Sequence, residues 1–252
     1  MRKLENKVAV ITGASSGIGR AIANNFAREG ATCIVIDMDQ KGIQEVVDLI
    51  VSEGNNAAGE VCDVGQALEV KELVAKLLAE YGSIDILVNN AGVMDDFMPA
   101  ADLDLKRWHH VMNVNLHGPF YFCHEMLPGM IERGKGTILN ISSVGGLQGA
   151  RAGAAYTAAK HGLIGLTKNI AFMYLSKGIR CNAIAPGGVK TNIGANMHPN
   201  AFGYERMMTG TANLPRMAEP EEIAAAALFL VSDDGSFVNG EVLVADGGWT
   251  AY

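Results

Sequence analysis

Long apolar stretches are missing from this chain of 252 residues. The longest strongly apolar run near the C-terminus, Ile223 to Val231, is far shorter than the roughly 18 residues that a membrane-spanning helix needs. The N-terminus is basic, but the run Val8 to Ile11 is too short for the apolar core of a signal peptide, about 7 to 15 residues. We therefore expect no membrane partner.

Cysteine and blocks of like charge are also scarce. The four cysteines, Cys33, Cys62, Cys123 and Cys181, are far apart and form no Cys-x-x-Cys pair. They are typical of small buried side chains in a reducing compartment, which predicts a cytoplasmic protein. The net charge of −7 is spread without a long run of either sign, which argues against nucleic-acid binding. His117, Cys123 and His124 share one helical segment, but no second ligand cluster completes a site, so we expect no metal.

Glycine, by contrast, is abundant. The chain has 30 glycines in 252 residues, about 12%, against a usual share of about 7%. Proline is rare, at 7 residues, and no Gly-X-Y repeat is present, which excludes collagen and linker-like composition. The fold must therefore need many backbone positions that lack a Cβ atom.

Short apolar runs alternate with longer helical patterns along the whole chain. The runs are Val8–Thr12, Cys33–Asp37, Ala57–Val61, Ile84–Asn89, Thr137–Ile141, Ile179–Ala185 and Glu241–Ala245. The helical patterns are Gly17–Glu29, Lys41–Glu53, Gln66–Tyr81, Leu105–Arg133, Ala155–Ser176 and Pro220–Ser232. Continuous apolar runs indicate parallel strands buried on both faces. We predict an α/β fold: a single Rossmann-like domain over residues 1–252, with a doubly wound parallel seven-stranded sheet and helices on both faces.

One segment interrupts this alternation. Residues Thr191 to Pro215 contain no clear strand or helix but carry several Met and aromatic side chains. A loop of this length in a compact domain is usually functional or disordered, and its apolar content argues against permanent disorder. The sequence predicts a lid over an apolar pocket at about residues 191–215, although its Met and aromatic side chains could equally fill the core.

A glycine-rich turn follows the first predicted strand and opens the first predicted helix. It reads Thr12-Gly13-Ala14-Ser15-Ser16-Gly17-Ile18-Gly19-Arg20. Glycines at these positions permit a tight turn, close approach to a pyrophosphate and close helix packing, while the first N–H groups of the helix face the phosphates. The strand–turn–helix context makes a dinucleotide site more probable than an ordinary glycine-rich turn.

The second predicted strand ends in Asp37, 24 residues after Gly13. A carboxylate at about this offset binds the adenosine ribose in dinucleotide folds. Its charge would repel the 2′-phosphate of NADP, and no Arg or Lys lies between Gly13 and Gly19. NAD(H) is therefore the expected cofactor; the alternative is an Asp that only caps the next helix.

Tyr156 and Lys160 are four residues apart in a helical pattern and so share one helix face. A free tyrosine has a pKa of about 10, and a cation one turn away favours the phenolate. We therefore expect Lys160 to lower the pKa of Tyr156 toward the working pH, where proton transfer is most efficient. Ser143 follows the fifth predicted strand, where its hydroxyl can hydrogen-bond a substrate oxygen.

Taken together, these motifs resemble the short-chain dehydrogenase/reductase family, of the Tyr-x-x-x-Lys type. Further matches follow in order along nearly the whole chain: Asp63-Val64, Asn89-Asn90-Ala91-Gly92, Pro186-Gly187 with Thr191, and Asp246-Gly247-Gly248. The resemblance implies that the NAD(H) site comprises Gly13, Ser15, Ser16, Gly17, Ile18, Gly19, Asp37, Met38, Asp63, Val64, Asn90, Ala91, Gly92, Tyr156, Lys160, Pro186, Gly187, Val189 and Thr191.

The same resemblance implies a catalytic set of Asn115, Ser143, Tyr156 and Lys160. Asn115 matches the asparagine that kinks a helix and holds a relay water beside the lysine. Asn113 and Ser142 are close alternatives, but the spacing to Tyr156 favours Asn115 and Ser143. His109-His110 is expected to be an exposed helical pair.

The substrate is expected to lie over the nicotinamide. The predicted pocket residues are Met94, Ser143, Gly145, Gln148, Tyr156, Gly188, Met197, Phe202 and Met207. This mostly apolar wall suits a secondary alcohol or ketone, such as a hydroxysteroid, bile acid or alicyclic alcohol. A 3-oxoacyl thioester of the acyl-carrier-protein reductases is the alternative, although those enzymes commonly use NADP. Enoyl reductases of similar fold typically have a longer Tyr–Lys spacing.

A non-catalytic NAD-binding scaffold or sensor would share the fold, but the complete Asn115, Ser143, Tyr156 and Lys160 set argues against it. By resemblance, we expect a homotetramer. The small side chains of the Tyr156 helix, including Ala155 and Gly162, would permit close helix approach.

Overall fold

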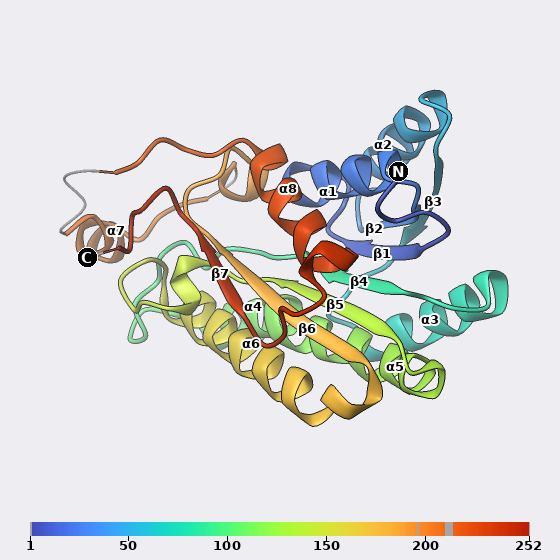
Figure 1. Ribbon diagram of the computed structural model, residues 1–252. Helices are drawn as coiled ribbons and strands as arrows, with labels where there is room; N and C mark the ends of the chain where they lie inside the picture. The colour runs from blue at the N-terminus through green and yellow to red at the C-terminus, as the bar shows by residue number, and fades with distance from the viewer. Residues whose placement is uncertain (1, 196, 210–213, 252) are drawn as a thin grey trace.

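The computed structural model describes residues 2–195, 197–209 and 214–251. Its centre is a seven-stranded sheet of order β3-β2-β1-β4-β5-β6-β7, in which every neighbouring pair is parallel (Figure 1). The strands are β1 (Val8–Thr12), β2 (Thr32–Asp37), β3 (Asn56–Val61), β4 (Ile86–Asn89), β5 (Gly136–Ile141), β6 (Ile179–Pro186) and β7 (Val242–Ala245). The strand order reverses between β1 and β4, which places the topological switch point there.

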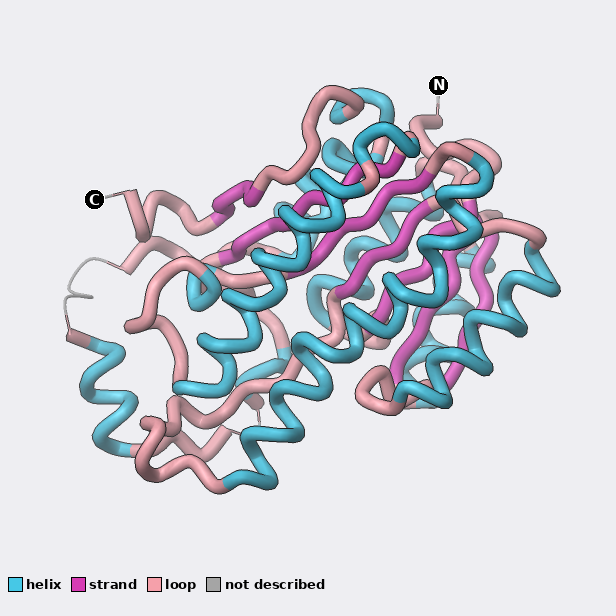
Figure 2. The backbone as a smooth tube through the Cα atoms, turned by 90° about the horizontal axis from the view of Figure 1, so that it is seen from below, coloured by secondary structure: helices cyan, strands magenta, loops and turns pink. Residues whose placement is uncertain are grey.

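Helices cover both faces of the sheet (Figures 1 and 2). They are α1 (Gly17–Arg28), α2 (Gln40–Ser52), α3 (Ala67–Tyr81), α4 (Leu105–Met112), α5 (Gly118–Arg133), α6 (Ala154–Met173), α7 (Ala201–Met208) and α8 (Pro220–Val231). One core packs α1, α2 and α8 against the sheet, and a second packs α3, α5 and α6 against its other face. None of the helices in the described ranges is long and apolar enough to cross a membrane. The predicted doubly wound fold is confirmed.

Burial along the strands follows their position in the sheet. The inner strands are almost wholly buried, as their continuous apolar sequences predict, and the four cysteines are buried and free, also as predicted. The prediction of two-sided burial is wrong for β3 and β7, which are partly exposed. Each is an edge strand with a single neighbour, so less of its surface is covered.

The predicted single helix over 105–133 is interrupted. A π-helical turn, Asn113–His117, lies between α4 and α5. The buried Asn115 amide nitrogen donates to the Val111 carbonyl at 3.0 Å and to the Val93 carbonyl at 2.9 Å. A side chain that bonds the backbone in this way replaces regular i to i−4 bonds, and such π-bulges are frequent at functional sites.

The segment 191–215 is not the structureless loop that the sequence predicts. It contains a 3₁₀ turn, Asn192–Gly194, and α7. The Asn200 side chain caps α7 by accepting from the Gly203 N–H at 2.9 Å, and the Asn200 N–H donates to the Asp96 carbonyl at 2.8 Å. The short helix was missed because its apolar spacing is weak. Residues 196 and 210–213 of the predicted lid lie outside the described residues.

Candidate active site

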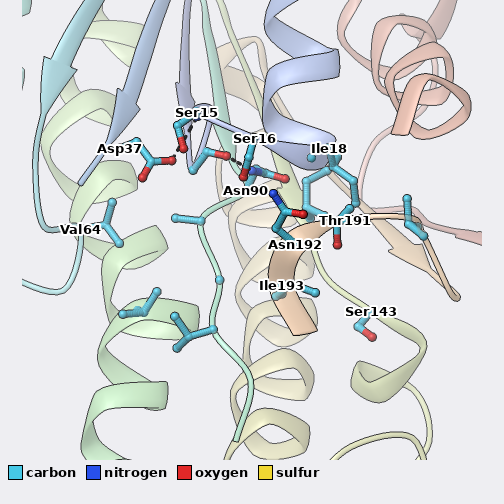
Figure 3. A pocket seen from close by; sticks show the side chains of 18 of the residues that line it. Ser15, Ser16, Ile18, Asp37, Val64, Asn90, Ser143, Thr191, Asn192 and Ile193 are labelled. Atoms are coloured by element: carbon cyan, nitrogen blue, oxygen red, sulfur yellow. Dashed lines mark hydrogen bonds between the residues drawn. The ribbon is translucent and has the colours of Figure 1, made fainter. Parts of the chain in front are cut away.

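A cavity of about 470 Å³ opens at the carboxyl ends of the inner strands (Figure 3). Every predicted cofactor residue except Gly19 lines it, and Ser143 lines it as well. In Figure 3, Asp37 and Val64 lie toward one end and Ser143 toward the other, with Thr191 and Ile193 between them. Its place at the switch point of a doubly wound sheet is where ligands bind in such folds.

Glycine is sterically required in the loop between β1 and α1. Gly13 has a φ of +63°, and a Cβ atom there would lie 2.7 Å from the Ala91 Cα atom. At Gly19 a Cβ atom would lie 2.3 Å from the Gly13 carbonyl oxygen, so this glycine permits close packing of α1 and does not face the cavity. The N-cap residue Ser16 makes no side-chain hydrogen bond, and the first turn of α1 has no acidic residue. This helix N-terminus suits a phosphate.

The glycine loop is tied to the end of β4. The Asn90 side-chain nitrogen donates to the carbonyl oxygens of Thr12 and Gly13, both at 2.9 Å. The Thr12 hydroxyl accepts from the backbone N–H groups of Asn90 at 3.0 Å and Ala91 at 3.1 Å. These bonds explain why asparagine follows β4: its amide satisfies backbone groups that the tight turn leaves free.

The Asp37 carboxylate organises the end of β2. It accepts from the backbone N–H groups of Ser15 at 3.1 Å, Met38 at 2.8 Å and Asp39 at 3.2 Å (Figure 3). No cation pairs with Asp37 among the described residues. The Asp37 carboxylate therefore lies at the wall of the cavity and is held there by backbone N–H groups.

The Ser143, Tyr156 and Lys160 side chains come together at the other end of the cavity. Ser143 follows β5, and its hydroxyl accepts from the Gly145 N–H at 3.0 Å. Tyr156 and Lys160 lie one turn apart on α6, and the Lys160 ammonium is 5.5 Å from the centre of the Tyr156 ring. Lys160 donates to the Ile141 carbonyl at 2.8 Å. The sequence therefore predicted correctly that these three residues meet.

The electrostatics differ from the expectation. Burial raises the pKa of Tyr156 to about 12, and the nearby Asp95 carboxylate acts in the same direction, while a hydrogen bond with Ser143 acts to lower it. Burial also lowers the pKa of Lys160 to about 8. The predicted lowering of the Tyr156 pKa by Lys160 is therefore wrong for the protein alone. Loss of hydration is the largest cause of both shifts, because both groups are buried.

The side chains of the two alternatives, Asn113 and Ser142, form hydrogen bonds with other parts of the chain. The Asn113 side-chain oxygen lies 2.9 Å from His117 Nδ1, whereas Asn115 Oδ1 accepts from the Val93 N–H at 3.2 Å. The Ser142 hydroxyl lines the cavity but donates to the Lys160 backbone carbonyl at 3.2 Å. This placement favours Asn115 and Ser143.

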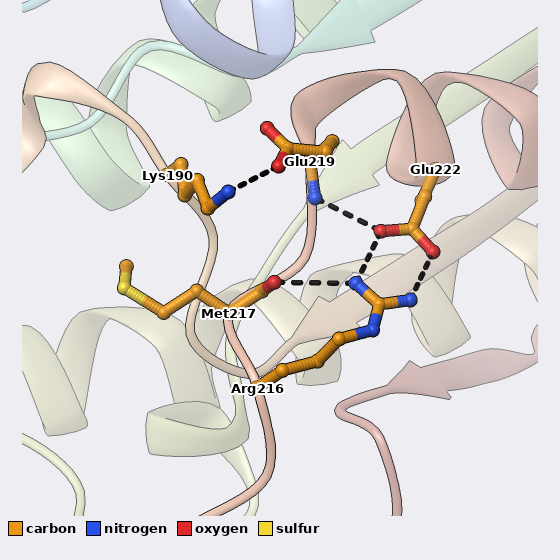
Figure 4. A network of polar contacts seen from close by, with 5 residues as sticks. All are labelled: Lys190, Arg216, Met217, Glu219 and Glu222. Carbon is orange, nitrogen blue, oxygen red and sulfur yellow. Dashed lines mark hydrogen bonds and ion pairs between the residues drawn. The ribbon is translucent and has the colours of Figure 1, made fainter.

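A polar network joins Lys190, shortly after β6, to residues 216–222 at the start of α8 (Figure 4). Lys190 pairs with Glu219, and the Arg216 guanidinium forms a two-bonded pair with Glu222, at 2.6 and 2.7 Å. Beside it, the Lys190 N–H donates to the Ala218 carbonyl at 2.9 Å, and the Ala218 N–H donates to the Gly188 carbonyl at 2.8 Å. The network holds the chain that leads from Val189 to Thr191, both of which line the cavity.

A family model described as Enoyl-(Acyl carrier protein) reductase matches residues 13–250. This span includes every motif described above except Thr12, the first residue of the glycine-rich turn. The chain belongs to the short-chain dehydrogenase/reductase family. It is therefore an oxidoreductase of a family that uses nicotinamide cofactors, and the family resemblance predicted from the sequence is confirmed.

Relatives in this short-chain dehydrogenase/reductase family match along nearly their whole length. The 3beta-hydroxysteroid dehydrogenase 2 of Eggerthella lenta is 43% identical over 99% of this chain and 96% of its own. The cyclohexanol dehydrogenase of an Acinetobacter species is 38% identical over 99% of this chain and 97% of its own. A solved putative NAD(P)-dependent gluconate 5-dehydrogenase from Beutenbergia cavernae, with NADP bound at low occupancy, is 38% identical over 99% of both chains, with a TM-score of 0.89.

The predicted substrate-pocket residues are not gathered in one place. Ser143 and Tyr156 line the cavity, but Met94, Gly145, Gln148, Gly188 and Met197 are absent from its wall. Gly145 nevertheless lies close by, since a Cβ atom there would be 3.4 Å from the Ser143 hydroxyl oxygen. Phe202 and Met207 line a separate cavity of about 620 Å³, between α7, Phe97–Pro99 and the start of α6.

Other residues at the site were not predicted. Asn192 and Ile193 line the cavity, and so does His110, which is also exposed as expected. Asp95, which follows the Asn89–Gly92 motif, is wholly buried against the start of α6. No pattern in the sequence distinguishes Asp95 from the neighbouring Asp96, so only the structure could reveal it.

Proposed function

We propose that this protein is an NAD(H)-dependent oxidoreductase that interconverts a secondary alcohol and a ketone, with Tyr156 as the acid/base. The observation that carries the proposal is a single cavity with the Gly13–Gly19 loop and Asp37 at one end and Tyr156, Ser143 and Lys160 at the other. Such a cavity can hold a dinucleotide with its reactive ring beside a proton-transferring group.

Bound NAD⁺ would supply the hydride acceptor. In the oxidation direction Tyr156 first gives its phenolic proton up toward Lys160, and the phenolate then takes the proton of the alcohol, while the Ser143 hydroxyl hydrogen-bonds the same oxygen. Lys160, whose pKa is lowered to about 8, can hold or release a proton near neutral pH. We propose that Lys160, with a water placed beside Asn115, returns the proton to solvent. Reduction uses the same groups in reverse.

The preference for NAD(H) rests on Asp37. Its carboxylate faces the cavity without a paired cation, and Met38, 66% exposed at the same wall, supplies no positive charge. Recognition of NADP usually needs an Arg near this point to bind the 2′-phosphate. The Beutenbergia cavernae relative was solved with NADP. Membership of the family therefore does not decide between NAD and NADP, and the proposal rests on the residues of this chain.

The substrate class that we propose is an apolar hydroxysteroid, bile acid or alicyclic alcohol. The names of the Eggerthella lenta and Acinetobacter relatives support this class. We also propose a homotetramer of single-domain subunits. Exposed apolar side chains near the ends of α6 and α8, among them Phe172 and Phe237, support association of several subunits.

The test is a spectrophotometric screen for NADH formation with a 3β-hydroxysteroid, cyclohexanol and a bile acid, and for NADH consumption with a 3-oxoacyl thioester. We expect turnover of a hydroxysteroid or alicyclic alcohol with NAD⁺ and much slower turnover with NADP⁺. Turnover of the thioester alone would support the acyl-carrier-protein reductase instead. Tight NADH binding without turnover of any compound would support a scaffold or sensor.

A further inference from the structure

The helix that carries Tyr156 does not cap its own N-terminus. The N-cap residue of α6 is Gly153, which has no side chain, and the first turn contains no acidic residue. The N–H groups at the start of a helix have no partner within the helix and must find one elsewhere. Tyr156 is the third residue of α6, so its own N–H is one of these groups.

A segment far away in the sequence supplies the missing partners. The Asp95 carboxylate accepts from the Gly153 N–H at 3.1 Å and from the Tyr156 N–H at 2.9 Å. The Met98 carbonyl accepts from the Ala154 N–H at 2.9 Å. Asp95 therefore binds the backbone of the proposed acid/base residue directly, across 61 residues of sequence.

The Asp95 carboxylate has no counterion among the described residues, although its side chain is 0% exposed. Arg107 pairs with the neighbouring carboxylate, Asp96. A buried, unpaired carboxylate is costly unless hydrogen bonds and a helix N-terminus compensate for its charge. Burial raises the pKa of Asp95, and the backbone N–H groups act to lower it. The N–H groups at the start of α6 stabilise the buried Asp95 carboxylate, and the carboxylate in turn satisfies those N–H groups.

The backbone around Asp95 is shaped for this contact. Asp96 and Phe97 have φ values of +55° and +54°, a conformation that is costly for residues other than glycine. Gly153 gives the segment room, because a Cβ atom there would lie 2.5 Å from Asp95 Oδ1. Strained backbone of this kind concentrates at functional sites, where the surrounding structure maintains it.

We propose that Asp95 is a positioning residue for Tyr156: its buried carboxylate fixes the first turn of α6 and places a negative charge near the phenol. This inference rests on the proposed function. The charged groups that bear on the phenol are then Asp95, which opposes its ionisation, and Lys160, one turn along the helix. Replacing Asp95 by an isosteric neutral side chain removes the charge and leaves one backbone N–H without an acceptor.

The test is Asp95→Asn, with Asp104→Asn as the matched control. Asp104 also caps a helix, α4, through the Arg107 N–H at 2.8 Å, but among the described residues no hydrogen bond or ion pair joins its side chain to α6. The ionisation of Tyr156 is followed by NMR in cofactor-free protein labelled with ¹³C at the tyrosine ring carbon that bears the hydroxyl. Its resonance is assigned by comparison with Tyr156→Phe. The kcat, KM and NADH affinity are measured in parallel.

We expect Asp95→Asn to lower the pKa of Tyr156 by about half a unit or more. It should also reduce kcat about 10-fold to 100-fold, because the phenol is no longer held in place, while NADH affinity is unchanged. Asp104→Asn should match the wild type in every readout. An unchanged Tyr156 pKa, or kcat and NADH affinity that fall together with thermal stability, would overturn the proposal in favour of a purely structural cap.

Gly153→Ala tests the same contact if Asp95→Asn does not fold. The added methyl group would lie 2.5 Å from both Asp95 Oδ1 and the Met98 backbone nitrogen, so it pushes this whole segment, carboxylate included, away from α6 without removing the charge. The kcat should fall while NADH affinity stays. Unchanged kcat in Gly153→Ala would contradict the positioning role. If the wild type oxidises no alcohol, the proposed function fails, and the NMR shift in cofactor-free protein separates that failure from failure of the link between Asp95 and Tyr156.

Discussion

Replacing Asp37 by Ala should shift the cofactor preference from NAD toward NADP. The carboxylate lies at the wall of the cavity, and three backbone N–H groups hold it in place. In the wild type it would accept charge-assisted hydrogen bonds from the ribose diol and repel a 2′-phosphate. Ala removes both effects, together with one hydrogen bond to the glycine loop, from the Ser15 N–H.

The size of the shift follows from these two contributions. A hydrogen bond to a charged group contributes about 1.5 to 3 kcal/mol, so its loss weakens NAD about 10-fold to 100-fold. Like charges about 4 Å apart repel by about 1 kcal/mol in water and about 4 kcal/mol at an effective dielectric constant near 20. Together they predict a change of at least about 100-fold in the ratio of kcat/KM for NAD to that for NADP. Adding Met38→Arg should increase NADP use further, since Arg binds phosphate well and residue 38 is exposed at the same wall.

The assay is steady-state kinetics with both cofactors, together with fluorescence titration of NADH and NADPH. Thermal melting is the control for stability. Asp37 also accepts a hydrogen bond from the Ser15 N–H at 3.1 Å, and loss of this bond should lower the free energy of unfolding by about 1 kcal/mol. A wild type that prefers NADP, or an Asp37→Ala variant with the same cofactor ratio as the wild type, would refute this account of Asp37.

Three further predictions concern the buried lysine, the glycine loop and the assembly. Lys160→Met should abolish turnover yet raise the free energy of unfolding by about 1 to 3 kcal/mol at pH 7, because burial lowers the Lys160 pKa from 10.5 to about 8. Since the folded protein holds this proton less tightly than the unfolded chain, the gain is full below pH 8 and shrinks as the pH rises toward 10.5, which urea unfolding at several pH values would check. Gly19→Ala should destabilise the protein by about 1 to 3 kcal/mol and weaken NADH binding, because its Cβ atom would lie 2.3 Å from the Gly13 carbonyl oxygen. Gly149→Ala is the matched control, since a Cβ atom there meets nothing within 4 Å; equal melting temperatures for the two variants would contradict the packing argument. Light scattering at micromolar concentration should give the mass of four chains, and the mass of one chain would exclude the tetramer.

The sheet and the glycine loop could be predicted from the sequence because local signals determine them. The buried strands are continuous apolar runs, and the glycines at 13, 17 and 19 stand at a strand–helix junction. The meeting of Ser143 with Tyr156 was also predictable, from the strand end at 141 and the helical spacing of Tyr156 and Lys160.

What could not be predicted depends on contacts between distant segments. The family resemblance implied a kink at Asn115, but its form, a π-helical turn, needs the Val93 carbonyl, 22 residues away. Helix α7 is capped by Asn200 and packs on Phe97, with a Cβ atom at Gly203 only 1.9 Å from the Phe97 carbonyl oxygen. The raised pKa of Tyr156 follows from burial, which spacing along a helix does not reveal.

The most direct test of the central claim compares the wild type with Tyr156→Phe. The phenyl ring keeps the packing of the buried side chain and removes only the hydroxyl that would carry the proton. The account predicts that kcat for NAD⁺-dependent oxidation of the best alcohol falls at least about 100-fold, while NADH affinity is almost unchanged. A Tyr156→Phe enzyme with a near-normal kcat would contradict the claim that Tyr156 transfers the proton.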